Sequence, residues 1–182
     1  GNDTFNSELL LKRDITLKEH IWTIFEYESS IGYQDDCAKE AYKKGVTARD
    51  ESISAALYRF SLDGHLDRER LLKATLATFH RSFKKDMAGW FAGFFETLQP
   101  TTGELLSLQE EMMQIFTSSY TKPVNVMLQQ LKNIASEEGF RYQEFIERAT
   151  TLFFSSPKNS LLTIYALFEK IVAQHPEMKE PC

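Results

Sequence analysis

Apolar residues recur every 37 positions along this 182-residue chain, and this period constrains its fold more than any other sequence feature. One column of the repeat holds Ile53, Trp90, Met127 and Ile164, and a second holds Leu57, Phe94, Leu131 and Phe168. Two further columns hold Leu71, Leu108 and Phe145, and Phe79, Phe116 and Phe153. Both helices of a two-helix unit therefore repeat. Stacked helix pairs need such a fixed period, because each pair buries its apolar faces only against its neighbours.

Capping residues mark several starts of the repeated helices. Asp67 is expected to cap one helix, because its short side chain can accept a backbone N–H of the first turn. Thr101 and Glu104 have the spacing of a capping box, which predicts that another helix begins there. Residues 47–176 are therefore predicted to form regular helix pairs, the first of them capped by Thr47.

The first 46 residues have a less regular pattern. Thr16 and Glu19 also have capping-box spacing and are followed by apolar residues at helical intervals, so we predict helix within residues 5–30. A short helix between loops is expected at residues 37–42. Irregular first helices are therefore predicted for residues 1–46.

These patterns predict an all-α fold, an α-α superhelix of about four helix pairs. The period of 37 residues lies between the 34 of tetratricopeptide arrays and the 40–47 of HEAT and armadillo arrays. Because the tetratricopeptide consensus is absent, a HEAT-like or armadillo-like solenoid fits better. We predict a single helical-repeat domain over residues 1–182 and expect it to be a fragment of a longer protein.

Three short segments carry a resemblance to a known family. They are Leu66-Asp67-Arg68, Ala88-Gly89-Trp90-Phe91 and Leu98-x-Pro100-Thr101-x-x-Glu104. In these segments the chain resembles an uncharacterised bacterial family of large HEAT-like repeat proteins, described only as a domain of unknown function. The resemblance extends over residues 48–176. Because its motifs belong to a helix and the turn that follows, the resemblance implies a fold and no activity.

Charge and cysteine content narrow the classes of partner. With 21 Lys and Arg against 26 Asp and Glu, the formal net charge is −5, so the domain as a whole does not attract nucleic acid or an anionic membrane. Only Cys37 and Cys182 are present, which favours a reducing compartment over a disulfide-stapled secreted scaffold. No apolar run approaches the roughly 20 residues of a membrane span. We therefore expect a cytoplasmic protein without a membrane partner.

The sequence contains no recognisable catalytic or metal-binding pattern. Its histidines do not lie at metal-ligand spacing with one another or with a cysteine. Asp35 and Asp36 precede Cys37, and neighbouring carboxylates oppose formation of a thiolate. Cys37 is therefore expected to be a small buried or half-buried residue rather than a nucleophile. We predict no enzyme activity, no metal and no cofactor.

One aromatic residue falls outside the predicted core of the stretch 88–104. Trp90 and Phe94 lie about 40° apart on a helix at 100° per residue, and we assign Phe91 to the core with them, whereas Phe95 lies about 140° from Trp90. In a solenoid that far side commonly lines the concave surface, and aromatic residues with Arg are typical of interface hot spots. We predict that a protein or peptide binds a strip made of Tyr58, Arg59, Phe95, Glu96 and Lys132. The alternative is that Phe95 packs beneath an adjacent helix.

A non-catalytic protein-interaction scaffold is the function that these observations favour. One alternative is a solenoid that binds nucleic acid through the basic segment 68–85, with Arg68, Arg81, Lys84 and Lys85 contacting phosphates. We favour the scaffold because the first helix of a pair, which carries Arg68, normally faces the convex side. Another alternative is a structural or regulatory module of a larger enzyme.

Overall fold

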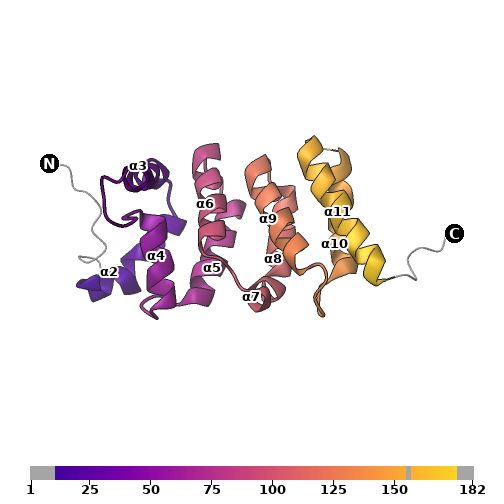
Figure 1. The fold of residues 1–182 in the computed structure, drawn as a ribbon, viewed down its shortest axis with the longest axis horizontal. Helices are drawn as coiled ribbons and strands as arrows, with labels where there is room; N and C mark the ends of the chain where they lie inside the picture. Colours follow the sequence, from indigo (N-terminus) through magenta and orange to yellow (C-terminus); the bar gives the residue numbers. More distant parts are fainter. Residues whose placement is uncertain (1–10, 155–156, 176–182) are drawn as a thin grey trace. The chain divides into compact units, whose positions relative to one another are not determined.

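The computed structural model describes residues 11–154 and 157–175, and over these residues the chain forms α- and 3-10 helices and no β-strand (Figure 1). The prediction of an all-α fold is therefore confirmed. The chain divides into two compact units, Gly1–Gln99 and Pro100–Cys182. That residues 1–182 make one helical-repeat domain stays a prediction.

The first unit contains five α-helices and two 3-10 helices in its described residues. They are α2 (Asp14–Lys18), η1 (His20–Phe25), α3 (Ile31–Lys43), α4 (Ile53–Leu62), α5 (Arg68–Ala77), η2 (Thr78–His80) and α6 (Lys85–Thr97). Helix α6 is the centre of this unit, because α3, α4 and α5 all pack against it.

Side-chain caps determine where α4 and α5 begin. The Asp67 carboxylate accepts the Arg70 N–H at 2.8 Å, which confirms the predicted cap of α5. The prediction that Thr47 caps the preceding helix is wrong. Ser52 caps α4, with its hydroxyl accepting the Ala55 N–H at 3.3 Å. Because the N–H of Ser52 itself donates to Asp50, the chain is turned into the helix at Ser52 and Thr47 remains in the loop.

The N-terminal helices differ from those predicted. Residues 5–10 lie outside the described residues, and beyond them α2 and η1 replace one continuous helix. Thr16 lies inside α2, whose N-cap is Arg13, so Thr16 and Glu19 form no capping box. The 3-10 winding of η1 turns Ile21, Trp22 and Phe25 into the core, and this burial outweighs the local preference for α-helix.

Helix α3 is longer than the predicted helix at 37–42, because tertiary contacts hold its first turns. Gly32 lies so close to α6 that a Cβ at this position would be 3.3 Å from the Trp90 Cβ. A glycine weakens a helix by about 1 kcal/mol relative to alanine, which makes this stretch look irregular in sequence. The close approach to Trp90 explains why a glycine stands there.

Aromatic rings fill the core of the first unit. The rings of Trp90 and Phe94 stack with centroids 5.3 Å apart, and Phe25 contacts Phe91 at 5.5 Å. Trp90, Phe91 and Phe94 are 7%, 0% and 1% exposed, so their predicted placement in the core is confirmed.

The second unit contains five α-helices and two 3-10 helices in its described residues. They are α7 (Thr102–Ser107), α8 (Gln109–Gln114), η3 (Ile115–Thr117), α9 (Thr121–Ile134), α10 (Tyr142–Ala149), η4 (Thr150–Phe154) and α11 (Lys158–Gln174). The predicted capping box of Thr101 and Glu104 is present at the start of α7. The chain then breaks at Leu108 rather than continuing as one helix, and the neighbouring Gln109 amide donates to the carbonyls of Leu106 and Gly139.

Helix pairs stack on one another within the second unit. Helix α8 packs against α9 and α10 against α11, while α8 also contacts α10 and α9 also contacts α11 (Figure 1). Side chains of α11 bond backbone carbonyls at the end of α9, with Lys170 donating to Lys132 and Gln174 donating to Ser136, both at 2.9 Å. The first helices of the two pairs, α8 and α10, are therefore adjacent to each other, and so are the second helices, α9 and α11.

Burial follows three of the four predicted 37-residue columns, and in the fourth Phe116 is buried but Phe79 and Phe153 are only half-buried. Ile53, Trp90, Met127 and Ile164 are all buried, as are Leu71, Leu108 and Phe145. The column of Leu57, Phe94 and Leu131 is also buried, but its last member, Phe168, is only half-buried on α11.

Candidate functional site

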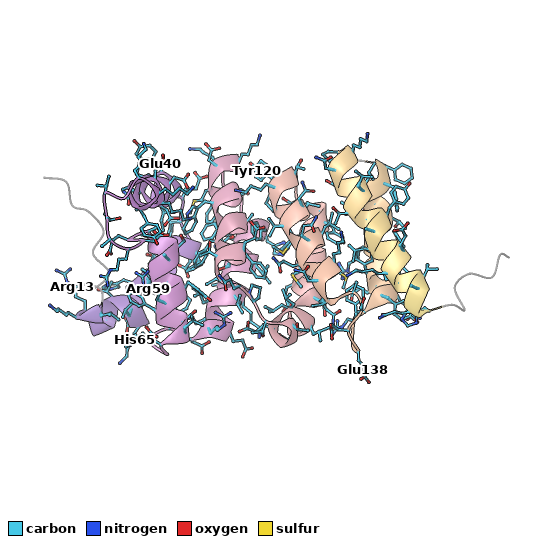
Figure 2. All side chains as sticks on the ribbon, in the orientation of Figure 1. Arg13, Glu40, Arg59, His65, Tyr120 and Glu138 are labelled. Carbon is cyan, nitrogen blue, oxygen red and sulfur yellow. The ribbon has the colours of Figure 1, made fainter. Side chains whose placement is uncertain are left out.

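Two residues of the predicted strip lie on α4 and are held by hydrogen bonds. The Tyr58 hydroxyl donates to the Gln99 side chain at 3.2 Å, and the Arg59 guanidinium donates to the Asp50 carbonyl at 3.0 Å. Both side chains are half-buried, and Figure 2 labels Arg59 on α4. Glu96, on α6 in the same unit, is exposed. Tyr58 and Arg59 therefore present partly open side chains in fixed positions.

Phe95 is not available at the surface. Its side chain is 0% exposed, so its predicted place in a binding strip is wrong and the packing alternative holds. The physical reason is that three helices of the first unit pack on α6, which buries more than the single face that a helical wheel assigns to the core.

Lys132 belongs to the second unit, where it is half-buried near the end of α9. Its backbone carbonyl accepts the ammonium group of Lys170 from α11. This contact places the Lys132 backbone where α9 and α11 meet.

The predicted basic segment is largely engaged in contacts within the first unit. Arg68 donates to the Leu98 carbonyl at 2.9 Å and to the Ser61 hydroxyl at 3.1 Å, so it ties the start of α5 to the end of α6. This correction removes Arg68 from the predicted phosphate contacts. The side chains of Arg70 and Lys73 also have partners, the Trp22 ring and Glu69.

Three residues of the predicted nucleic-acid surface remain exposed. Arg81, Lys84 and Lys85 lie at and just before the start of α6. The Lys84 ammonium is 3.6 Å from the Glu28 carboxylate, and the Lys84 N–H donates to that same side chain. The acidic neighbour lowers the positive potential that a phosphate would meet there.

Asp35 on α3 is a buried carboxylate whose role the sequence patterns did not identify. Asp35 is 0% exposed and accepts hydrogen bonds from the Ser54 N–H and hydroxyl, both at 2.8 Å, and from the Trp90 indole at 2.9 Å. It also pairs with Lys39 at 2.7 Å, one turn along the same helix. Both carboxylate oxygens therefore accept hydrogen bonds from groups of the first unit, which suits an anchor.

The surroundings of Asp35 favour its charged form. Burial, the largest single influence, would raise the pKa of this carboxyl group. The hydrogen bonds from Lys39, the Ser54 backbone and Trp90, with the positive charge of Lys39, together outweigh it and hold the pKa below its ordinary value. Only the (i, i+4) spacing of Asp35 and Lys39 was visible in the sequence, because Ser54 and Trp90 are distant along the chain.

Cys37 also differs from its prediction. It was expected to be buried or half-buried, but it is exposed. The helical twist of α3 separates it from Asp35: the aspartate faces α4 and α6, and Cys37, two residues later, faces away.

A hollow of about 420 Å³ lies in the second unit, between the α9–α10 loop and the end of α11. Its lining residues are Ala135, Ser136, Glu137, Glu138, Gly139, Phe140, Tyr142, Gln174 and His175. The rings of Tyr142 and His175 stack there, 3.9 Å apart, and Glu138 projects outward from the loop in Figure 2. The carbonyls of Ser136 and Gly139 already accept bonds from Gln174 and Gln109, so these lining groups are not directed at a ligand.

Within residues 11–154 and 157–175, no three His, Cys, Asp or Glu side chains are grouped so that they could hold a metal ion. None of the helices formed by these same residues is both long and apolar enough to cross a membrane.

Comparison with known proteins identifies a family and no characterised relative. A family model described as Domain of unknown function (DUF6493) matches residues 2–159. Neither the curated proteins nor the solved structures contain a match. The match agrees with the resemblance to an uncharacterised family, and its description names neither a repeat type nor an activity.

Proposed function

We propose that this chain, which belongs to the DUF6493 family of domains of unknown function, is a non-catalytic scaffold of the HEAT-like repeat type that binds a protein or peptide. The observation that carries the proposal is the stacking of helix pairs in the second unit, where α8 contacts α10 and α9 contacts α11. Solenoids of this kind present extended surfaces built from many successive helices, which suits them to binding other chains.

The proposed binding surface lies in the first unit, on the side of α4 and α6 that carries Tyr58, Arg59 and Glu96. Lys132 on α9 is a separate candidate contact in the second unit. Because the Tyr58 and Arg59 side chains are already hydrogen-bonded, they would lose little further conformational entropy when a partner binds. The low cysteine content supports a reducing compartment such as the cytoplasm.

Affinity capture followed by measurement with the purified partner tests this proposal. We expect Tyr58→Ala and Arg59→Glu each to weaken binding at least about tenfold, since partly buried Tyr and Arg residues dominate interface energies. Lys43→Glu is the matched control, because it reverses an exposed charge on α3 outside the proposed contacts. Circular dichroism should show that all three variants keep the helical fold. Unchanged affinity in both strip variants would overturn this surface.

A further inference from the structure

The outer side of α11 is an apolar surface in the described part of the second unit. Leu162 and Tyr165, one turn apart on this helix, are each 57% exposed, and Phe154 in the neighbouring η4 is 95% exposed. Phe153 contacts the Tyr165 ring at 5.7 Å and so continues this surface from η4 onto α11. Large apolar side chains grouped in this way commonly mark a contact surface.

The position of Tyr165 is covered in α4, α6 and α9, whereas that of Leu162 is buried only in α6, at Ala88, and half-buried at Asn125 and Glu51. One, two and three steps of 37 residues before Tyr165 lie Leu128, Phe91 and Ser54, and each of these is 0% exposed. The column of Val172 behaves alike, because Ala135, Leu98 and Ser61 are buried whereas Val172 is only half-buried. The exposed face of α11 is therefore the face that the repeat buries elsewhere.

What covers this face on α9 is the next helix pair. Helix α11 lies alongside α9 (Figure 1), and its Lys170 and Gln174 donate to the carbonyls of Lys132 and Ser136. One step of 37 residues on lie Glu169 and Ala173, but α11 continues to Gln174, so both are inside the helix, whereas α9 ends at Ile134. Helix α11 thus repeats the apolar feature by which α9 receives its neighbour, and its helix end differs.

We propose that the outer face of α11 and η4 is the docking surface for a further helix pair of the same repeat. Its second helix lies along α11 as α11 lies along α9, placing apolar side chains on Leu162 and Tyr165. Where α9 uses Asn125 to bond Ser160, α11 has Leu162, so the incoming pair is more apolar at that point. The proposal rests on the repeat architecture of the proposed function and not on the Tyr58 and Arg59 surface.

An extended chain tests the docking surface directly. Residues 1–175 are followed by a second copy of residues 139–175, which adds one α10–α11 pair at the 37-residue step. The copy carries Phe at the position equivalent to Tyr165, so that nitration in the peptide around that position reports on Tyr165 alone. Chemical nitration of Tyr165, followed by mass spectrometry, should be at least about fivefold slower than in the original chain, and the melting temperature should rise by about 5 °C as the new interface forms. The matched control is the same extension on a chain with Leu162→Glu and Tyr165→Glu, which should lose the rise.

Two variants of the original chain test the docking surface without depending on whether the extended chain folds. Tyr165→Ala should leave the melting temperature nearly unchanged, whereas Leu128→Ala, in the same column of α9, should lower it strongly because that site is covered. Equal losses would overturn the proposal. It would also be overturned by an extension that stays unfolded or leaves Tyr165 as reactive as before. A chain that dimerises in light scattering, and becomes monomeric with Leu162→Glu, would instead assign the face to a second copy.

Discussion

Asp35 shows how one residue can join three helices of the first unit. Its carboxylate lies on α3 and receives hydrogen bonds from Ser54 at the start of α4 and from Trp90 in α6. Removing the charge while the donors stay buried leaves N–H and O–H groups without an acceptor. The side chain therefore contributes to stability more than any exposed carboxylate nearby can.

We expect Asp35→Asn to lower the free energy of unfolding by about 3 kcal/mol at neutral pH, because it breaks a buried, charge-assisted network. Asp36→Asn, at the exposed neighbouring position, should have almost no effect. Urea unfolding followed by circular dichroism measures both. Equal stability of the two variants would contradict the anchoring role.

The contribution of Asp35 to the free energy of unfolding depends on pH, and the direction of its pKa shift gives the sign. The pKa of Asp35 in the folded state is below its ordinary 3.8, so the charged form stabilises the fold at neutral pH. This contribution is lost as the pH falls below 3.8 and passes through the folded-state pKa. The stability difference between the original chain and Asp35→Asn should therefore shrink at acidic pH.

At the scale of the element, two of the three helix starts with a side-chain cap agreed with the sequence, and the third, at Ser52 of α4, had been placed at Thr47. The starts of α5 and α7 follow from Asp67 and from the Thr101 capping box. The break into α2 and η1 and the full length of α3 depend on burial against other helices, which no local pattern records. The end of α6 also depends on a distant contact, because Arg68 on α5 donates a hydrogen bond to a carbonyl there.

We expect Arg68→Ala to lower the free energy of unfolding by about 2 kcal/mol, since it leaves carbonyls at the end of α6 without their charged donor. Lys85→Ala, an exposed position at the start of α6, is the control and should change stability by less than about 0.5 kcal/mol. Thermal and urea unfolding provide the comparison. Unchanged stability of Arg68→Ala would contradict the role of Arg68 in holding the end of α6.

At the scale of the whole molecule, the sequence and the structure agree on helices and on the columns that form the core. The chain carries a net charge of −5, and in its basic segment Arg68, Arg70 and Lys73 already contact groups of the first unit. The net negative charge repels phosphates at long range, and the contacts of these basic side chains compete with phosphate binding. Both effects disfavour nucleic acid as the partner.

We accordingly expect DNA and RNA of mixed sequence to bind with a dissociation constant weaker than about 100 μM at physiological salt. A gel-shift or fluorescence-anisotropy titration at several salt concentrations measures this. The paired variant Lys84→Glu with Lys85→Glu should behave like the original chain. Tight, salt-dependent binding that this variant abolishes would favour the nucleic-acid alternative over the protein scaffold.

By itself the sequence determined that the chain is helical, where α5 and α7 begin, and that Trp90, Phe91 and Phe94 belong to the core. These properties depend on neighbours within one or two helical turns, which periodicity and capping patterns record. The tertiary structure alone decided that Phe95 is buried, that Asp35 is an anchor and that Arg68 binds the end of α6. Each of these depends on helices packed from several sides or on partners far away in sequence, such as Asp35 and Trp90, 55 residues apart.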